Sequence, residues 1–81
     1  MHLRDTVEMM LSENYKERFK AEYWQLVLRL DELIGIMIKL ENDMLNYKLP
    51  CSKETLENQV LFMQGYLGSL RLRAEIEGIK I

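Results

Sequence analysis

The stretch from Phe19 to Tyr47, FKAEYWQLVLRLDELIGIMIKLENDMLNY, decides the fold of this 81-residue chain. Its apolar residues recur at alternating spacings of four and three, which is the heptad signature of one continuous helical face. That face consists of Phe19, Tyr23, Leu26, Leu30, Leu33, Met37, Leu40, Met44 and Tyr47. The pattern predicts a long helix over residues 14–46.

The second half of the chain repeats the alternation and predicts a second helix over residues 53–77. Its apolar positions are Leu56, Val60, Met63, Leu67, Leu70 and Ala74. Pro50 breaks the helical pattern because it lacks a backbone N–H, and Ser52 is a residue type that caps helix N-termini. Gly78 is placed to end the second helix, leaving residues 79–81 as a short tail. We therefore expect an antiparallel two-helix hairpin.

A short helix over residues 6–11 is expected to precede the hairpin. Asp5 followed by Glu8 resembles a capping box, and the pattern breaks around Ser12 and Asn14. All three helices fit one domain over residues 1–81, since a chain of this length forms one small domain at most. The predicted fold class is all-α.

The apolar residues of the long helix exceed what one partner helix can cover. Its middle is apolar around most of its circumference, and the second helix carries a further shoulder of Phe62, Tyr66 and Ile76. Exposed patches of this kind mark interaction sites, so we expect a homo-oligomeric helical bundle built from hairpins. A different protein that supplies the missing surface is the alternative. Gly35 falls opposite Gly65 in the hairpin, which predicts a close approach of the two helices there.

Composition and charge exclude several function classes. The 11 Lys and Arg against 13 Asp and Glu give a net charge of −2, which disfavours a long nucleic acid as partner. The longest apolar run, Leu33 to Ile38, is far shorter than the roughly 20 residues of a membrane span. His2 is the single histidine and Cys51 the single cysteine. These residues predict no catalytic triad, no metal site, no cofactor and no enzymatic activity.

One group of residues suggests a ligand site. Aromatic and basic side chains crowd the start of the long helix, and the hairpin returns the basic end of the second helix to the same region. The candidate ligand-binding residues are Tyr15, Lys16, Arg18, Lys20, Tyr23, Arg71 and Arg73. Aromatic rings stack on nucleobases and cations bind phosphates, so the group suits a compact anionic ligand. The alternative is pairing with the interleaved glutamates Glu17, Glu22, Glu75 and Glu77 at helical spacing.

Three segments resemble a widespread group of small phage-encoded helical hairpins. They are residues 15–23 (YKERFKAEY), residues 49–52 (LPCS) and residues 66–79 (YLGSLRLRAEIEGI). The group is similar to the hairpin shared by anti-CBASS and anti-Thoeris proteins, which act as sponges for immune signalling nucleotides. The opening motif with Arg18 and the closing motif with Arg73 carry most of the resemblance.

The resemblance implies a non-enzymatic anti-defence protein that works in the cytoplasm of an infected bacterium. Such a protein sequesters cyclic di- or trinucleotides at the interfaces of a homo-oligomer, expected to be a hexamer, without cleaving them. Arg18 and Arg73 are then the leading contacts to phosphate or base. Anti-Thoeris members carry an additional β-rich region, which this chain lacks, so the resemblance favours sites on the hairpin itself. An adaptor hairpin that binds a phage or host protein through its apolar face is the alternative.

Overall fold

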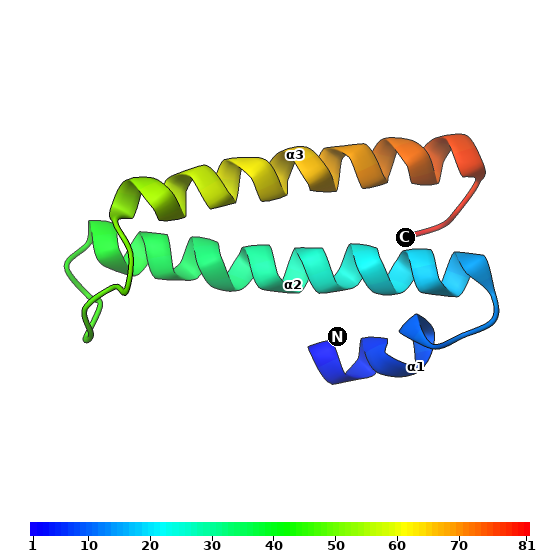
Figure 1. Ribbon diagram of the computed structural model, residues 1–81, viewed down its shortest axis with the longest axis horizontal. Coiled ribbons are helices and arrows are strands. Elements are labelled where there is room, and N and C mark those ends of the chain that lie inside the picture. The colour runs from blue at the N-terminus through cyan, green and yellow to red at the C-terminus, as the bar shows by residue number, and fades with distance from the viewer.

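Two long antiparallel helices dominate the computed structural model, which describes residues 1–81 (Figure 1). Helix α2 spans Tyr15–Glu41 and helix α3 spans Lys53–Glu77. They follow a 3₁₀-helix, η1 (Leu3–Thr6), and a short helix, α1 (Val7–Met10). The structure contains helices and no strands, and α2 packs against α3. The predicted all-α hairpin with a short helical segment before it is confirmed.

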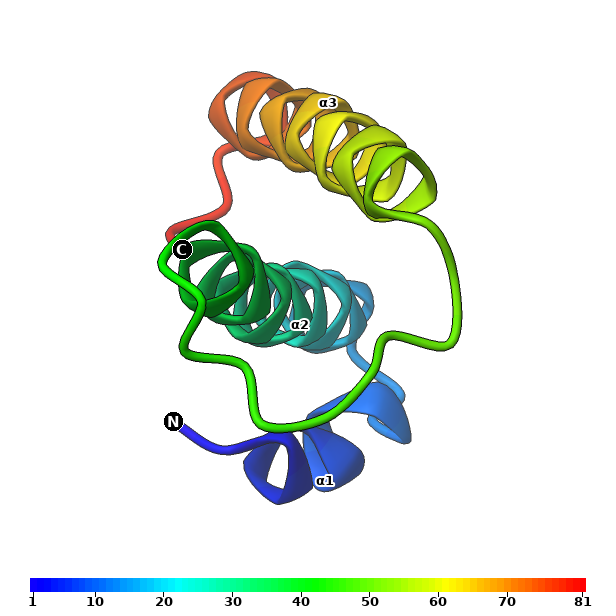
Figure 2. The same cartoon turned by 90° about the vertical axis from the view of Figure 1, so that its left-hand side faces the viewer.

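Helix α2 is the central element of the chain. It lies between α3 on one side and the η1–α1 segment on the other (Figure 2). Thr6 of η1 is fully buried, where its hydroxyl accepts a hydrogen bond from Gln25 Nε2 at 2.9 Å and donates one to the Leu3 carbonyl at 2.6 Å. Part of the wide apolar surface of α2 is therefore covered within the chain, by a segment to which sequence reasoning gave no such role.

The first helical turn begins earlier than predicted and uses Asp5 differently. The backbone N–H of His2 donates to Asp5 Oδ2 at 2.8 Å, which places Asp5 at the third helical position and makes His2 the N-cap. The helical segment therefore begins at Leu3 rather than at Thr6. The predicted break before the long helix is present, since Asn14 Oδ1 caps α2 by accepting from the Lys16 N–H at 2.9 Å.

The long helix ends five residues before the predicted end, at Glu41 instead of Asn46. Asp43 adopts a left-handed conformation with φ of 54°, and the N–H groups of Asp43 and Met44 donate back to the carbonyls of Leu40 and Lys39. This is a Schellman motif, which closes a helix by satisfying its last carbonyls. The connection to α3 is therefore longer than the heptads implied. Two predicted face residues, Met44 and Tyr47, lie in it and are exposed.

Both ends of α3 follow their sequence signals. Ser52 Oγ accepts from the Thr55 N–H at 3.1 Å, and Gly78 ends the helix with φ of 69°. The N–H groups of Gly78 and Ile79 return to the carbonyls of Glu75 and Ala74, forming a second Schellman motif. The segment after α3 folds back toward α2 (Figure 1). Ile79 in this segment is only 6% exposed, so it belongs to the core rather than to a free tail.

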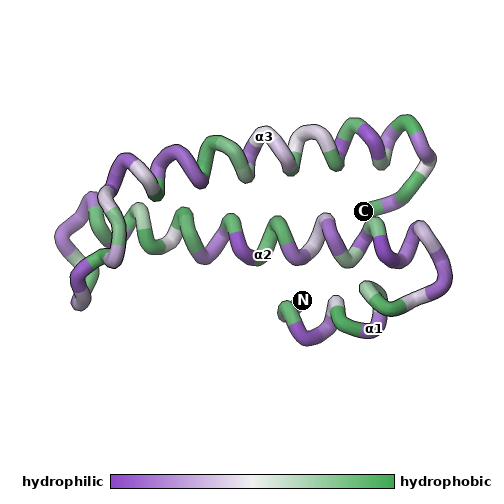
Figure 3. The backbone as a smooth tube through the Cα atoms, in the orientation of Figure 1, coloured by the Kyte–Doolittle hydropathy of each residue, from purple (hydrophilic) through white to green (hydrophobic).

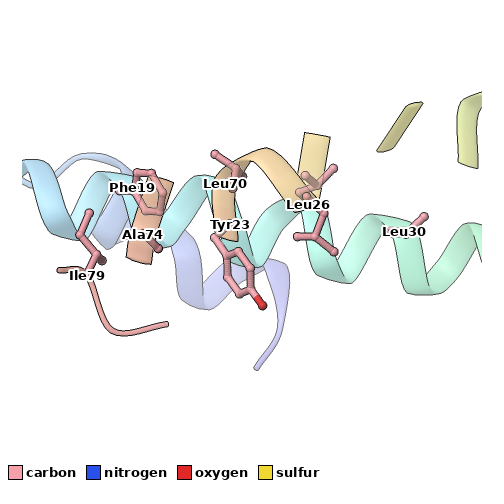
Figure 4. Packing of buried hydrophobic residues seen from close by; sticks show 8 residues of the cluster. Phe19, Tyr23, Leu26, Leu30, Leu70, Ala74 and Ile79 are labelled. Carbon is pink, nitrogen blue, oxygen red and sulfur yellow. The ribbon is translucent and has the colours of Figure 1, made fainter. Parts of the chain in front are cut away.

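The core lies at the end of the hairpin that holds the two chain termini. It contains Phe19, Tyr23, Leu26, Leu30, Leu67, Leu70, Ala74 and Ile79. In Figure 4, Phe19 and Tyr23 of α2 lie beside Ala74 and Leu70 of α3, and Ile79 closes the end of the cluster. Towards the connection, most residues that face across the hairpin are only partly buried, among them Ile34, Val60 and Met63, and Leu56 is the buried exception. The tightest packing is therefore next to the predicted ligand site.

The predicted close approach at the glycines is wrong. A methyl group added at Gly35, Gly65 or Gly68 meets no atom within 4 Å, so none of the three brings the two helices together. The reason is their direction around the axis of α3: Gly65 and Gly68 do not lie at the heptad positions that face α2. The middle of α3 contains segments of near-neutral hydropathy (Figure 3).

Two glycine substitutions are expected to change stability in opposite directions. Gly35→Ala removes the entropic cost of a glycine inside α2 and should raise the free energy of unfolding by about 1 kcal/mol. Gly78→Ala places a side chain at a left-handed position and should lower it by roughly 1 kcal/mol. Urea unfolding followed by circular dichroism measures both. A loss of stability in Gly35→Ala would show that its surroundings are tighter than the structure has them.

Candidate anion site at the start of α2

The antiparallel arrangement brings Tyr15, the first residue of α2, against the last turns of α3. Arg73 Nη2 donates to the Tyr15 hydroxyl oxygen at 2.8 Å, and the Tyr15 hydroxyl donates to Glu77 Oε1 at 2.7 Å. Arg73 Nε completes the ring with a bond of 3.3 Å to Glu77 Oε2. We call these three residues the Tyr15–Arg73–Glu77 cluster. It joins Tyr15 to two side chains that are about sixty positions away in the sequence.

The Phe19 ring lies beneath this cluster. The Arg73 guanidinium carbon lies 5.0 Å from the centre of the Phe19 ring, within the range of a cation–π contact. The Tyr15 and Phe19 rings are 6.3 Å apart and tilted by 57°. Because Phe19 is itself buried in the core, the packing of α2 on α3 fixes the place where the Arg73 charge is held.

The cluster is accessible from solvent. The side chain of Arg73 is 48% exposed and that of Glu77 33% exposed, and Tyr15 is exposed as well. An exposed ion pair at helical spacing contributes little to stability because water screens the two charges. Nη1 of Arg73 makes no hydrogen bond within the chain. The cluster thus offers a positioned cation, an aromatic ring and unused donors to a ligand that approaches from solvent.

Glu77 is the member of the cluster that sequence reasoning did not include among the site residues. It was considered only as one of several possible ion-pair partners at helical spacing, and for Arg73 that pairing is present. The hydrogen bond from Tyr15 lowers the pKa of the Glu77 carboxyl, with Arg73 adding to the effect. The same hydrogen bond raises the pKa of the Tyr15 hydroxyl. Glu77 is therefore the ionised acceptor that occupies both Tyr15 and Arg73.

Two of the candidates contact other parts of the fold. Arg18 turns away from the cluster, and its Nη1 donates to the Ser12 carbonyl at 2.8 Å, which ties down the turn before α2. Tyr23 is buried in the core, where its ring meets Trp24 edge-on at 5.2 Å between centres. In the protomer, neither residue lies in the Tyr15–Arg73–Glu77 cluster.

The remaining candidates lie on the same ends of α2 and α3 without joining the cluster. Lys16 and Arg71 are exposed and Lys20 is half-buried, and their side chains make no hydrogen bond or ion pair. Arg71 precedes Arg73 by two residues and therefore points about 200° away around α3. Of the seven sequence candidates, the structure brings Tyr15 and Arg73 into direct contact.

No group of three His, Cys, Asp or Glu side chains is placed to hold a metal ion. None of the helices combines the length and the hydropathy that crossing a bilayer requires. The hollows of the protomer surface lie elsewhere, and none of them is lined by Tyr15, Arg73 or Glu77.

A comparison with protein families adds an independent finding. The family model named Sequestin matches residues 13–76, which include all of α2, the connection and all of α3 except Glu77. The chain belongs to the Sequestin family. The match does not extend to η1 and α1, so the segment on the far side of α2 lies outside the Sequestin region. Neither a curated protein nor a solved structure matches the chain.

The Sequestin region contains Tyr15, Phe19 and Arg73 and ends one residue before Glu77. The aromatic and cationic parts of the cluster thus belong to the matched region, whereas the acidic partner lies just beyond it. Among the sequence candidates, Lys16, Arg18, Lys20, Tyr23 and Arg71 also fall inside the match.

The hydrogen bonds of the cluster predict a measurable change in titration. In Tyr15→Phe the Glu77 carboxyl loses its strongest stabilising contact, so its pKa should rise toward the ordinary value for glutamate. A lowered folded-state pKa stabilises the fold above the ordinary carboxyl pKa, and this contribution is lost as pH falls through the folded value. Carbon-detected NMR titration of the Glu77 carboxyl in both proteins tests the assignment. An unchanged Glu77 titration in Tyr15→Phe contradicts the geometry.

Proposed function

We propose that this Sequestin protein binds and sequesters cyclic di- or trinucleotide immune signals without cleaving them. The observation that carries the proposal is the Tyr15–Arg73–Glu77 cluster, where a cation and an aromatic ring stand side by side at an accessible end of the hairpin. The family name, which denotes sequestration, supports the same activity. The protein acts in the cytoplasm of an infected bacterium, where it competes with the defence effector for its activator.

The chemistry of the cluster fits an anionic nucleotide. Arg73 retains donors for charge-assisted hydrogen bonds to a phosphate, and the exposed Tyr15 ring has a face on which a base can stack. Lys16 and Lys20 add positive charge at the same end of α2. A net charge of −2 matches a compact ligand held by local cations rather than a long polymer.

Tight binding of a small ligand requires that most of its surface be buried. In one protomer the cluster lies on open surface, so a second protomer must supply the other wall of the site. We therefore propose that the active form is a homo-oligomer, with a hexamer as the expected state, and that ligand binding stabilises it. Arg18 contributes to such a site from a neighbouring subunit or through the turn that it supports. Tyr23 contributes through the core on which the cluster packs.

Sequestration is then a matter of mass action and needs no catalytic group. Affinity in the nanomolar range corresponds to about −12 kcal/mol, of which a single charge-assisted hydrogen bond contributes about 1.5–3 kcal/mol. Loss of the Arg73 contacts should therefore weaken binding by roughly ten- to a hundredfold.

Arg73→Ala tests the proposal directly. Isothermal titration calorimetry with cyclic GMP–AMP, cyclic di-AMP and cyclic triadenylate should show tight binding to the wild type and at least tenfold weaker binding to Arg73→Ala. Arg4→Ala removes the same charge in η1, outside the Sequestin region, and should bind as the wild type does. Ligand released by denaturation should be chemically intact. Absence of binding to the wild type across this panel contradicts the proposal, and cleavage products contradict its non-enzymatic part.

The Glu77 carboxylate accepts hydrogen bonds from Tyr15 and Arg73, which are the donors that a bound phosphate would use. The phosphate must therefore displace the carboxylate. Glu77→Gln removes the competing negative charge and should strengthen binding of the same nucleotides severalfold, most strongly at low ionic strength. Glu75→Gln is the matched control, because it removes an equal charge two residues away from a side chain without hydrogen bonds or ion pairs. Equal gains in both variants would assign the effect to net charge alone.

The alternative function is that of an adaptor whose apolar face binds a phage or host protein. The exposure of large apolar side chains on α3, above all Phe62 and Ile76, favours it. An adaptor would leave Arg73 paired with Glu77 and would bind none of the nucleotides. The calorimetric panel therefore separates the two functions.

A further inference from the structure

The Glu77 carboxylate occupies its place in the Tyr15–Arg73–Glu77 cluster in the way that a bound anion would. Its two oxygens are used separately: Oε1 accepts from the Tyr15 hydroxyl at 2.7 Å, and Oε2 accepts from Arg73 Nε at 3.3 Å. The same hydroxyl accepts from Arg73 Nη2 at 2.8 Å, so its hydrogen is left for the anion. The cluster therefore offers one donor to each oxygen of a two-oxygen anion.

The two donors are positioned by contacts that do not involve Glu77. The Arg73 guanidinium carbon lies 5.0 Å from the centre of the Phe19 ring, and Phe19 is fixed in the core. The hydrogen bond between Arg73 Nη2 and the Tyr15 hydroxyl links α3 to α2 directly. When the carboxylate leaves, Arg73 Nε and the Tyr15 hydroxyl therefore keep their places for another anion.

A phosphodiester is the phosphate group that matches this carboxylate. Both groups carry one negative charge at neutral pH and two free oxygens on one central atom, and arginine binds both in the same two-bond pattern. A phosphomonoester differs, since it has three free oxygens and a charge of about −1.5 to −2. Only the phosphodiester can replace the carboxylate without a change of charge.

The displaced carboxylate remains close to the site. Glu77 follows Arg73 by four residues, so both side chains leave the same side of α3. Gly78 then ends the helix in a left-handed conformation, and the N–H of Ile79 donates to the Ala74 carbonyl at 2.8 Å. Because Ile79 is buried in the core, the backbone at Glu77 is held from both sides. Its side chain can rotate away from Arg73, but its charge stays near the bound anion.

We infer that Glu77 makes this site specific for phosphodiesters over phosphomonoesters. A phosphodiester takes over both hydrogen bonds of the carboxylate, whereas any further charge on the phosphate is repelled by the displaced Glu77. Two unit charges about 4 Å apart in water change a binding constant by about fivefold. The inference rests on the proposed function, because it names the part of the nucleotide that the cluster recognises.

This specificity separates an intact cyclic signal from its hydrolysis product. Hydrolysis of one phosphodiester in a cyclic dinucleotide adds one water across a P–O bond. The products of that step are a free hydroxyl and a terminal phosphomonoester on the same linear molecule. Linear pApA therefore carries a phosphomonoester that cyclic di-AMP lacks. A site that disfavours this group remains free for intact signal while spent signal accumulates.

The displacement of Glu77 is tested with the smallest phosphodiester, dimethyl phosphate. In excess dimethyl phosphate the pKa of the Glu77 carboxyl, followed by carbon-detected NMR, should rise, because the carboxyl loses the Tyr15 hydrogen bond that lowers its pKa. Sodium chloride at the same ionic strength is the control and should leave the titration unchanged. A Glu77 pKa that dimethyl phosphate does not raise overturns the inference.

The specificity is tested by calorimetry with cyclic di-AMP and linear pApA. Lys16 and Lys20 attract both ligands and are present in every variant, so the ratio of the two affinities isolates the effect of residue 77. The wild type should bind cyclic di-AMP more tightly than pApA. Glu77→Gln should gain about fivefold more for pApA than for cyclic di-AMP. Glu75→Gln removes an equal charge outside the cluster and should keep the wild-type ratio.

The outcomes separate this specificity from the proposed function. An equal gain for both nucleotides in Glu77→Gln, or a wild type that prefers pApA, overturns the inference and leaves sequestration of cyclic di-AMP standing. If no cyclic nucleotide binds while dimethyl phosphate still raises the Glu77 pKa, the proposed function fails and the phosphodiester site is supported.

Discussion

The apolar contact between α2 and α3 around Phe19 is the interaction on which the rest of the structure depends. Phe19, Leu70, Ala74 and Ile79 pack together at the end of the hairpin that carries the chain termini. Because Phe19 is held there, Arg73 has an aromatic ring beneath its guanidinium and Tyr15 is brought within hydrogen-bonding distance of Arg73. The same contact therefore forms the end of the hydrophobic core and positions the side chains of the candidate ligand site.

Two surfaces of the hairpin remain exposed when this contact has formed. The Tyr15–Arg73–Glu77 cluster is solvent-exposed, with Glu77 occupying the groups that an anionic ligand would use. The outer face of α3 exposes leucines and an isoleucine that find no cover within the chain. Both features have the same consequence. The homo-oligomer that we propose would supply the missing surface in both places.

Much of the fold follows from local signals in the sequence. The heptads place two helices, Ser52 and Gly78 cap α3, and Asn14 caps α2. Tyr15 and Arg73 meet because an antiparallel hairpin must bring the start of one helix to the end of the other. The misplaced end of α2 has a different cause: the heptad continues through Met44 and Tyr47, but the left-handed Asp43 stops the helix before them. Apolar periodicity alone does not report a backbone conformation that an aspartate side chain tolerates.

The sequence by itself determined the hairpin, its direction and the end at which cations and aromatic rings collect, because these depend on periodicity and on helix-capping residues. Only the tertiary structure decided which cation meets which ring. Arg18 and Arg73 are equivalent as residue types, yet Arg18 binds the Ser12 carbonyl and Arg73 lies over Phe19. The tertiary structure also decided that α1 covers the back of α2 and that the glycines of α3 face outward. These outcomes depend on the rotation of each helix about its own axis, which is set by packing between residues far apart in the chain.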